Sequence, residues 1–134
     1  MAKPSNPFVL QGAKILMAED DDLVARVFRA ILERFGGQVV RVSGGRAAIQ
    51  AAHDHHFDVA LLDLGLPDMD GTEVARQVND LPCIALTGND SAQHRQACED
   101  AGMVGYLVKP PHPEALVQEI ARHLAVGAHG AEVI

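Results

Sequence analysis

Cysteine is scarce in this chain of 134 residues, and its pattern argues against two kinds of stabilising site. The two cysteines, Cys83 and Cys98, have neither the spacing of metal ligands nor the number that a disulfide framework requires. The sequence also lacks an apolar run of the roughly 20 residues that a membrane-spanning helix needs. No apolar segment of the signal-peptide type lies among the first ten residues, which contain Pro4 and Pro7. We therefore expect a cytoplasmic protein with no membrane partner.

Basic residues are outnumbered, with 11 lysines and arginines against 18 aspartates and glutamates, for a formal charge of −7. Without a basic stripe to neutralise phosphates, a direct nucleic-acid partner is not expected. Hydrophobic residues make up 48% of the chain, as is ordinary for a soluble globular protein. A chain of this length can bury a core without disulfides or bound metals. We expect one folded domain at 13–125, between a leader or linker at 1–12 and a flexible tail at 126–134.

Short apolar runs alternate five times with segments of helical periodicity. The runs predict strands at 14–18, 39–42, 59–62, 82–86 and 106–108, and the periodic segments predict helices at about 22–35, 45–54, 72–79, 90–102 and 113–124. Asp22 and Ser43 are the expected caps of the first two helices. Each parallel crossover requires a helix, so the alternation predicts an α/β fold with a five-stranded parallel sheet and helices on both faces.

Four of the five predicted strands end in a side chain that can take part in chemistry. Glu19 and Asp20 follow the first strand, Asp63 ends the third, Thr87 follows the fourth and Lys109 follows the fifth. Open parallel sheets bind ligands outside the carboxyl ends of their strands, so we expect these side chains to share one rim. Each alone has an ordinary explanation, as a helix cap, a strand-end residue or a surface ion pair. The set of five favours a functional site.

Three carboxylates on one rim repel one another, by on the order of 4 kcal/mol per pair at about 4 Å and an effective dielectric constant of about 20. Lys109 and a hard divalent cation are the two candidates that could offset this repulsion. Mg²⁺ is commonly held by one or two carboxylates together with phosphate oxygens. An aspartate in such a site is a potential nucleophile toward phosphorus, and Asp63 is the candidate. A lysine, a metal ion and a threonine hydroxyl would stabilise the charge of the transferring group.

Four blocks of the chain, in order, resemble the signature blocks of a response-regulator receiver domain of the CheY-like family. The blocks are residues 15–21 (ILMAEDD), 63–71 (DLGLPDMDG), 85–88 (ALTG) and 105–110 (GYLVKP). The resemblance covers about residues 13–125. It implies a flavodoxin-like three-layer sandwich with strand order 2-1-3-4-5 and five helices. It fits a single-domain protein and a receiver excised from a hybrid sensor kinase equally well.

The resemblance implies a phosphorylation-dependent signalling switch in two-component signal transduction. Asp63 would be the phosphoacceptor, taking a phosphoryl group from a histidine of a partner histidine kinase or phosphotransfer protein. Asp20, Asp63 and the backbone carbonyl of Gly65 would ligate Mg²⁺, with Glu19 acting through a bound water. Thr87 and Lys109 would contact the phosphoryl group.

The resemblance also implies how such a switch would signal. Thr87 and Tyr106 would be the switch residues. Output would pass to an effector or a second copy through the face of the fourth helix, fifth strand and fifth helix. The domain would catalyse only its own phosphorylation and dephosphorylation, so no other enzyme activity is expected. Glu19 where an aspartate is frequent and Pro111 where an aromatic is more usual are departures from the family pattern.

Two other functions remain open on the residues alone. An aspartate-nucleophile phosphatase or phosphotransferase would act on small phosphate esters, but that class places its nucleophile after the first strand instead of the third. A receiver-like docking scaffold without phosphorylation is disfavoured because Asp63, Thr87 and Lys109 are all present. His53, His55 and His56 cluster at a predicted helix end, where surface histidines are commoner than a metal site. The other histidines, His94, His112, His123 and His129, are expected at the surface.

Overall fold

The computed structural model describes residues 9–124. Within this range, five parallel strands form one sheet in the order β2-β1-β3-β4-β5. The strands are β1 (Lys14–Ala18), β2 (Gln38–Val42), β3 (Val59–Asp63), β4 (Cys83–Thr87) and β5 (Gly105–Val108). The predicted strand order and parallel pairing are confirmed. Every residue of β3 and β4 is buried, because these two central strands are covered on both faces.

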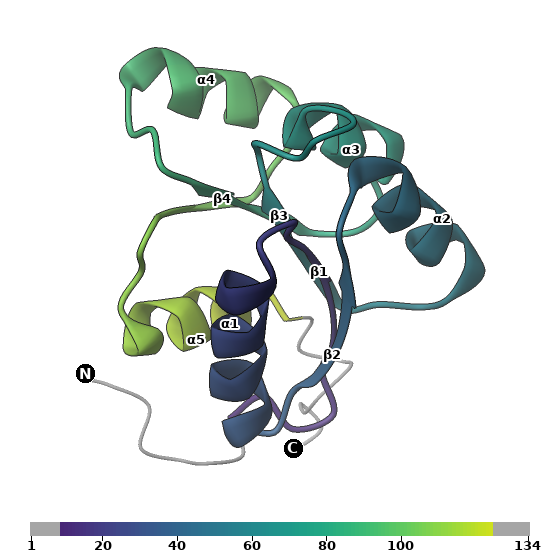
Figure 1. Cartoon of the computed structure of the whole chain (residues 1–134), viewed down its shortest axis with the longest axis vertical. Coiled ribbons are helices and arrows are strands. Elements are labelled where there is room, and N and C mark those ends of the chain that lie inside the picture. The colour runs from purple at the N-terminus through teal and green to yellow at the C-terminus, as the bar shows by residue number, and fades with distance from the viewer. Residues whose placement is uncertain (1–8, 125–134) are drawn as a thin grey trace.

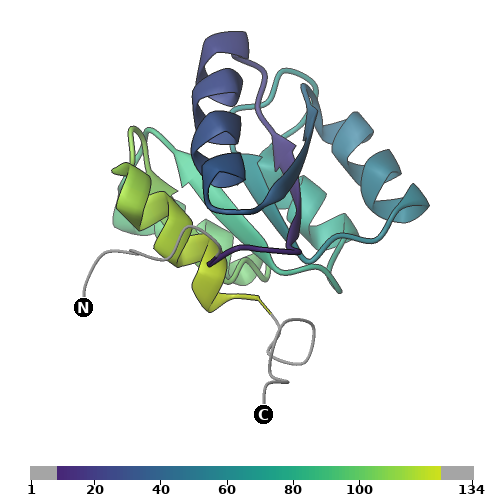
Figure 2. The ribbon, with the colours of Figure 1, turned by 90° about the horizontal axis from the view of Figure 1, so that it is seen from below.

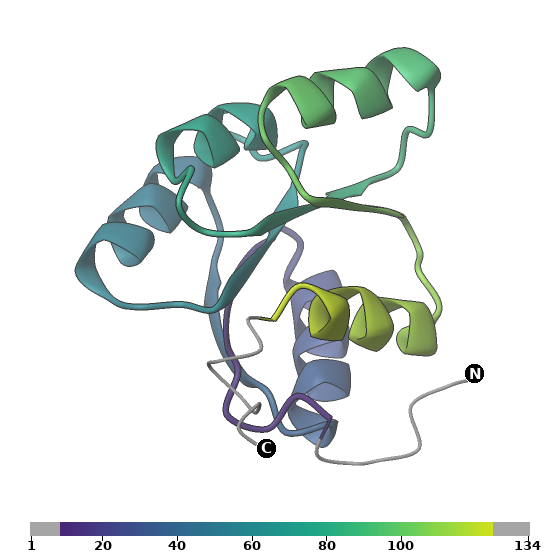
Figure 3. The same cartoon turned by 180° about the vertical axis from the view of Figure 1, so that it is seen from behind.

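Within residues 9–124, five helices cover the two faces of the sheet and complete the predicted three layers. They are α1 (Asp22–Arg34), α2 (Gly45–Asp54), α3 (Gly71–Gln77), α4 (Ala92–Asp100) and α5 (Pro113–Arg122). α1 and α5 lie on one face, and α2, α3 and α4 lie on the other, as Figures 1 and 3 show from opposite sides. Figure 2 shows the same separation from below, with α1 and α2 on opposite sides of β1 and β2.

The core consists of two apolar clusters, one on each face of the sheet. Successive strand residues point to opposite faces. In β3, Val59 and Leu61 therefore join the cluster beneath α1 and α5, whereas Ala60 and Leu62 join the cluster beneath α2, α3 and α4. This two-sided packing fixes the register of β3 and hence the place where its last residue emerges.

The final part of the predicted leader is packed against the domain. Leu10 is fully buried in the cluster beneath α1, and its backbone N–H donates to the carbonyl of Phe35 at 2.9 Å. The domain boundary expected at residue 13 stays a prediction. Residues 1–8 and the predicted tail at 126–134 lie outside the described residues. No helix in the described part of the chain is long and apolar enough to span a membrane.

Two of the predicted helix caps are wrong. Asp21, not Asp22, caps α1, and its Oδ1 accepts from the backbone N–H groups of Leu23 and Val24. At α2 the cap residue is Gly44, which makes no side-chain cap, so Ser43 does not fill that role.

The first N–H groups of α2 are satisfied from a distant loop. Gly45 N donates to Asp68 Oδ1 at 2.7 Å, and Arg46 N donates to Asp68 Oδ2 at 3.0 Å. These N–H groups lower the pKa of the Asp68 carboxyl below its usual value. Asp68 follows β3, so the contact ties the start of α2 to the loop that carries the functional rim.

Candidate functional site

The carboxyl ends of β1, β3, β4 and β5 are neighbours in the sheet, and the predicted polar side chains meet there. Glu19 and Asp20 follow β1, Asp63 ends β3, Thr87 ends β4 and Lys109 follows β5. Asp63 pairs in register with Leu86, one residue before Thr87. The parallel register thus brings together side chains from four separate segments, as the alternation of strands and helices predicted.

Glu19, Asp20 and Asp63 form one group of carboxylates in which each residue offers a ligand oxygen within 4.8 Å of the others. Among the described residues this is the one group of three or more metal-ligating side chains found that close together. Glu19 is fully buried and Asp63 is 6% exposed, whereas Asp20 is exposed and opens the group to solvent. An all-oxygen set with an open side suits a hard cation such as Mg²⁺.

Lys109 supplies positive charge to this group. Its Nζ lies 3.1 Å from Glu19 Oε1 and 3.2 Å from Asp63 Oδ2. Partial burial acts to lower the pKa of Lys109, but the two carboxylates outweigh it and the pKa is raised. Burial raises the pKa of Glu19, even though the Asp21 N–H and Lys109 favour its charged form. One ammonium group therefore faces two buried carboxylates, and negative charge remains in excess.

One oxygen of Glu19 is left without a hydrogen bond. Glu19 Oε2 accepts from the backbone N–H of Asp21 at 3.1 Å. Glu19 Oε1 is close enough to Lys109 for an ion pair, but it makes no hydrogen bond to any described residue and is buried. This oxygen is held by charge alone, so it could also accept a hydrogen bond from a water held by a cation.

Asp63 is held at a fixed place by the loop that follows it. Its Oδ1 accepts from the backbone N–H of Gly65 at 3.0 Å, and the N–H of Leu64 donates to the carbonyl of Leu86 at 3.1 Å. At Gly71 a Cβ would lie 2.7 Å from the carbonyl oxygen of Asp63, so only glycine permits this close return of the chain. The nucleophile candidate is thus carried on a rigid strand end with a tightly folded loop beside it.

Thr87 has a partner that the sequence analysis missed. Thr87 Oγ1 lies 3.0 Å from Nε2 of His94, a half-buried residue in the first turn of α4. The expectation that His94 is a plain surface residue is wrong. The position of His94 in the sequence could have indicated this contact. His94 follows Thr87 by only seven residues, and side chains in the first turn of a helix point back toward the end of the preceding strand.

Tyr106, the predicted switch aromatic, lies on β5 next to this pair. Its ring meets the ring of His94 edge to face, with centroids 6.4 Å apart. The guanidinium carbon of Arg95 lies 4.3 Å from the centroid of the Tyr106 ring, and the tyrosine hydroxyl donates to the carbonyl of Asn89. Tyr106 is therefore held by the loop between β4 and α4 and by α4 itself.

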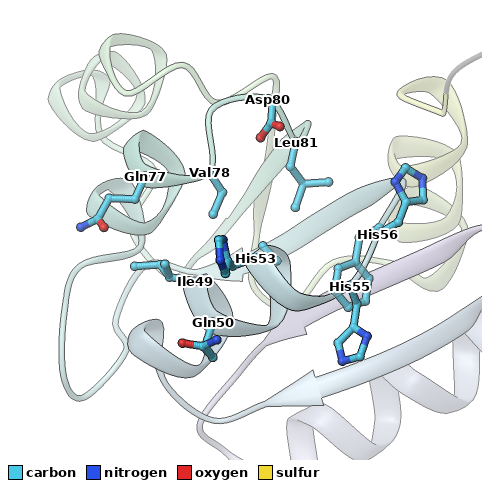
Figure 4. A pocket seen from close by; sticks show the side chains of 11 residues that line it. Ile49, Gln50, His53, His55, His56, Gln77, Val78, Asp80 and Leu81 are labelled. Carbon is cyan, nitrogen blue, oxygen red and sulfur yellow. The ribbon is translucent and has the colours of Figure 1, made fainter.

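The histidine cluster at the end of α2 lies elsewhere. His53, His55 and His56 line a pocket of about 500 Å³ between α2 and α3. The pocket lies near the amino ends of β3 and β4, whereas Asp63 is at the carboxyl end of β3. Figure 4 shows the rings of His55 and His56 pointing away from each other. All three are exposed, and they are absent from the candidate metal groups of residues 9–124.

Comparison with known proteins gives the family. A family model described as the response regulator receiver domain matches residues 15–121, which is most of the chain. The chain therefore belongs to the response regulator receiver domain family, and it is a receiver domain of two-component signalling. The resemblance that the four sequence blocks indicated is confirmed.

In two relatives the region that matches this chain is part of a longer protein. The sensor protein GacS of Pseudomonas syringae pv. syringae is 30% identical over 125 residues, which cover 87% of this chain and 14% of that protein. The transcriptional regulatory protein SrrA of Staphylococcus aureus is 33% identical over 110 residues, covering 80% of this chain and 46% of SrrA. The chain thus spans less than half the length of each of these two relatives.

A solved structure of similar size supports the fold. The chemotaxis response regulator CheY4 of Vibrio cholerae matches with a TM-score of 0.78 at 30% identity, covering 84% of this chain and 98% of that one. Together with the strand order β2-β1-β3-β4-β5, this match confirms the flavodoxin-like, CheY-like fold.

Proposed function

We propose that Asp63 accepts a phosphoryl group from a phosphohistidine of a partner histidine kinase or histidine phosphotransfer protein. The observation that carries the proposal is the meeting of three carboxylates with the ammonium of Lys109, which lies 3.2 Å from Asp63 Oδ2. Asp63 is the member of the group that ends a central buried strand, so its position is the most tightly fixed. The domain acts as a switch and catalyses only its own phosphorylation and dephosphorylation.

Mg²⁺ fits the residues at this rim. Asp20, Asp63 and the carbonyl of Gly65 would hold it, and Oε1 of Glu19, which also faces Lys109, would accept from a metal-bound water. When bound, the ion neutralises charge on the transferring group and orients its oxygens. The exposed Asp20 keeps the site open to solvent, as an exchangeable ion requires.

In the transfer step, a carboxylate oxygen of Asp63 forms a bond to phosphorus while the bond between phosphorus and the donor imidazole nitrogen breaks. The imidazole leaves, and the acid becomes an aspartyl phosphate. Lys109 would keep its charge throughout, because its raised pKa holds the proton at neutral pH. Thr87 is a buried residue on the neighbouring strand, and its hydroxyl would donate to a phosphoryl oxygen after a small movement.

The signal would leave through the face formed by α4, β5 and α5, where Tyr106 packs on His94, the neighbour of Thr87. An effector or a second copy of the chain would dock there, in a cytoplasmic setting. The relatives named above, a sensor protein and a transcriptional regulatory protein, suggest a phosphorelay or a regulator as the surrounding system.

The test is incubation with acetyl phosphate and Mg²⁺, followed by intact mass measurement. One acid-labile phosphate is expected, and it should not form when the metal is chelated before acetyl phosphate is added. Asp63→Asn should abolish it while preserving the fold, because the amide has nearly the same shape and is not a nucleophile. Asp80→Asn, which changes an exposed acid in the loop before β4, is the matched control. Undiminished phosphorylation of Asp63→Asn would overturn the proposal.

A further inference from the structure

The hydroxyl of Thr87 is already engaged on two sides. The backbone N–H of Asn89 donates to Thr87 Oγ1 at 3.0 Å, and His94 Nε2 lies 3.0 Å from the same oxygen. A threonine hydroxyl has one proton and two lone pairs. Asn89 occupies one lone pair, so the contact with His94 uses either the hydroxyl proton or the second lone pair.

His94 is directed toward Thr87 by the start of α4. Ser91 caps the helix, and its Oγ accepts from the backbone N–H of His94 at 3.1 Å, which places His94 in the first turn. Helical side chains tilt toward the amino end of their helix. The imidazole therefore lies between the end of β4 and the ring of Tyr106 on β5.

We propose that neutral His94 accepts the hydroxyl proton of Thr87. This hydrogen bond holds Thr87 in the position that it has when Asp63 is not phosphorylated. The inference rests on the proposed function, in which the same proton is donated to the phosphoryl group on Asp63. One hydroxyl proton cannot serve both acceptors at once. His94 is thus a positioning residue that competes with the phosphoryl group for Thr87.

The competition reaches Tyr106 through direct contact. When the Thr87 hydroxyl turns toward Asp63, the imidazole loses its partner while it still packs edge to face on the Tyr106 ring. The ring of Tyr106 also stacks against the guanidinium group of Arg95, which follows His94 in α4. A movement of His94 therefore changes the packing of Tyr106 and α4 together, and couples phosphorylation to the output face.

The affinity for beryllofluoride, a phosphoryl mimic, measures this competition in the presence of Mg²⁺. His94→Leu should raise the affinity about two- to tenfold, the range that corresponds to one net hydrogen bond. His94→Gln, which keeps an acceptor at similar reach, should stay near the wild type. His55→Leu, which replaces an exposed histidine at the other end of the sheet, is the control for general effects.

Two further measurements separate positioning from a merely structural role. In a Thr87→Ala background, His94→Leu should change the affinity little, because the contested proton is absent. In ¹⁵N NMR of the wild type, His94 Nε2 should have the shift of an unprotonated acceptor, and should change when beryllofluoride binds. Unchanged affinity in His94→Leu, or a protonated Nε2 in the neutral imidazole, would overturn the inference while phosphorylation at Asp63 still stands. A complete absence of beryllofluoride binding would instead overturn the proposed function, and this inference with it.

Discussion

Nζ of Lys109 lies 3.2 Å from Oδ2 of Asp63, although 46 residues separate them in the chain. Lys109 follows β5, the edge strand, and Asp63 ends β3, so the lysine reaches past the end of β4. Its second partner is the buried carboxylate of Glu19. This ion-pair group is both a structural element and the centre of the proposed chemistry.

Lys109→Met should destabilise the metal-free protein by about 1–3 kcal/mol, because it removes the ammonium group that faces the buried oxygens Glu19 Oε1 and Asp63 Oδ2. Urea unfolding at neutral pH in the presence of a chelator measures the change. Lys14→Met, at the exposed start of β1, is the control and should have little effect. Equal stabilities of Lys109→Met and wild type would show that the lysine does not offset the carboxylates.

Magnesium should raise the melting temperature of the wild type. A ligand that binds only the folded state stabilises it by about 2.7 kcal/mol at a free concentration of about 100 times Kd. Asp20→Asn should lose most of this response, since it removes the exposed ligand of the carboxylate group. Differential scanning calorimetry with and without millimolar Mg²⁺ tests the prediction, with Asp80→Asn as the control. A wild-type melting temperature indifferent to the ion would contradict a shared site.

Thr87→Ala should keep phosphorylation at Asp63 but uncouple it from the output face, because no hydroxyl remains to follow the phosphoryl group. In amide NMR spectra, beryllofluoride should then shift the loops around Asp63 and leave Tyr106 and α4 unchanged. Thr87→Ser keeps the hydroxyl and should restore the shifts in α4. Shifts in α4 that persist in Thr87→Ala would assign the coupling to another residue.

Asp68→Asn should lower the melting temperature at neutral pH, since the charged carboxylate accepts from two backbone N–H groups at the start of α2. The folded state lowers the pKa of Asp68, so its stabilisation is complete above the unfolded value, near 3.9. The stabilisation is lost as the pH falls through the lower, folded value. The difference in melting temperature between variant and wild type should therefore be full at pH 7 and shrink in acid, where Asp80→Asn again provides the control. A difference that does not vary with pH would show that the charge is irrelevant to the cap.

The amino-acid sequence by itself determined the strands, their alternation with helices and the placement of Asp63 at a strand end. These features follow from local periodicity: a short apolar run that stops at a carboxylate and is followed by Gly65 and Pro67 can be recognised without knowing its neighbours. The shared rim followed too, because the carboxyl ends of parallel strands must lie at the same edge.

Only the tertiary structure decided which partners the side chains have. Asp68 caps a helix that begins 23 residues earlier, Leu10 fills a space against α1, and His94 reaches the hydroxyl of Thr87. Each contact depends on how the connecting loops position two elements relative to each other. The periodicity of apolar residues in the sequence does not show this relative position. Apolar periodicity shows which face of an element is buried, whereas the pairing of polar atoms is set by distances of a few ångströms that exist only after the layers have packed.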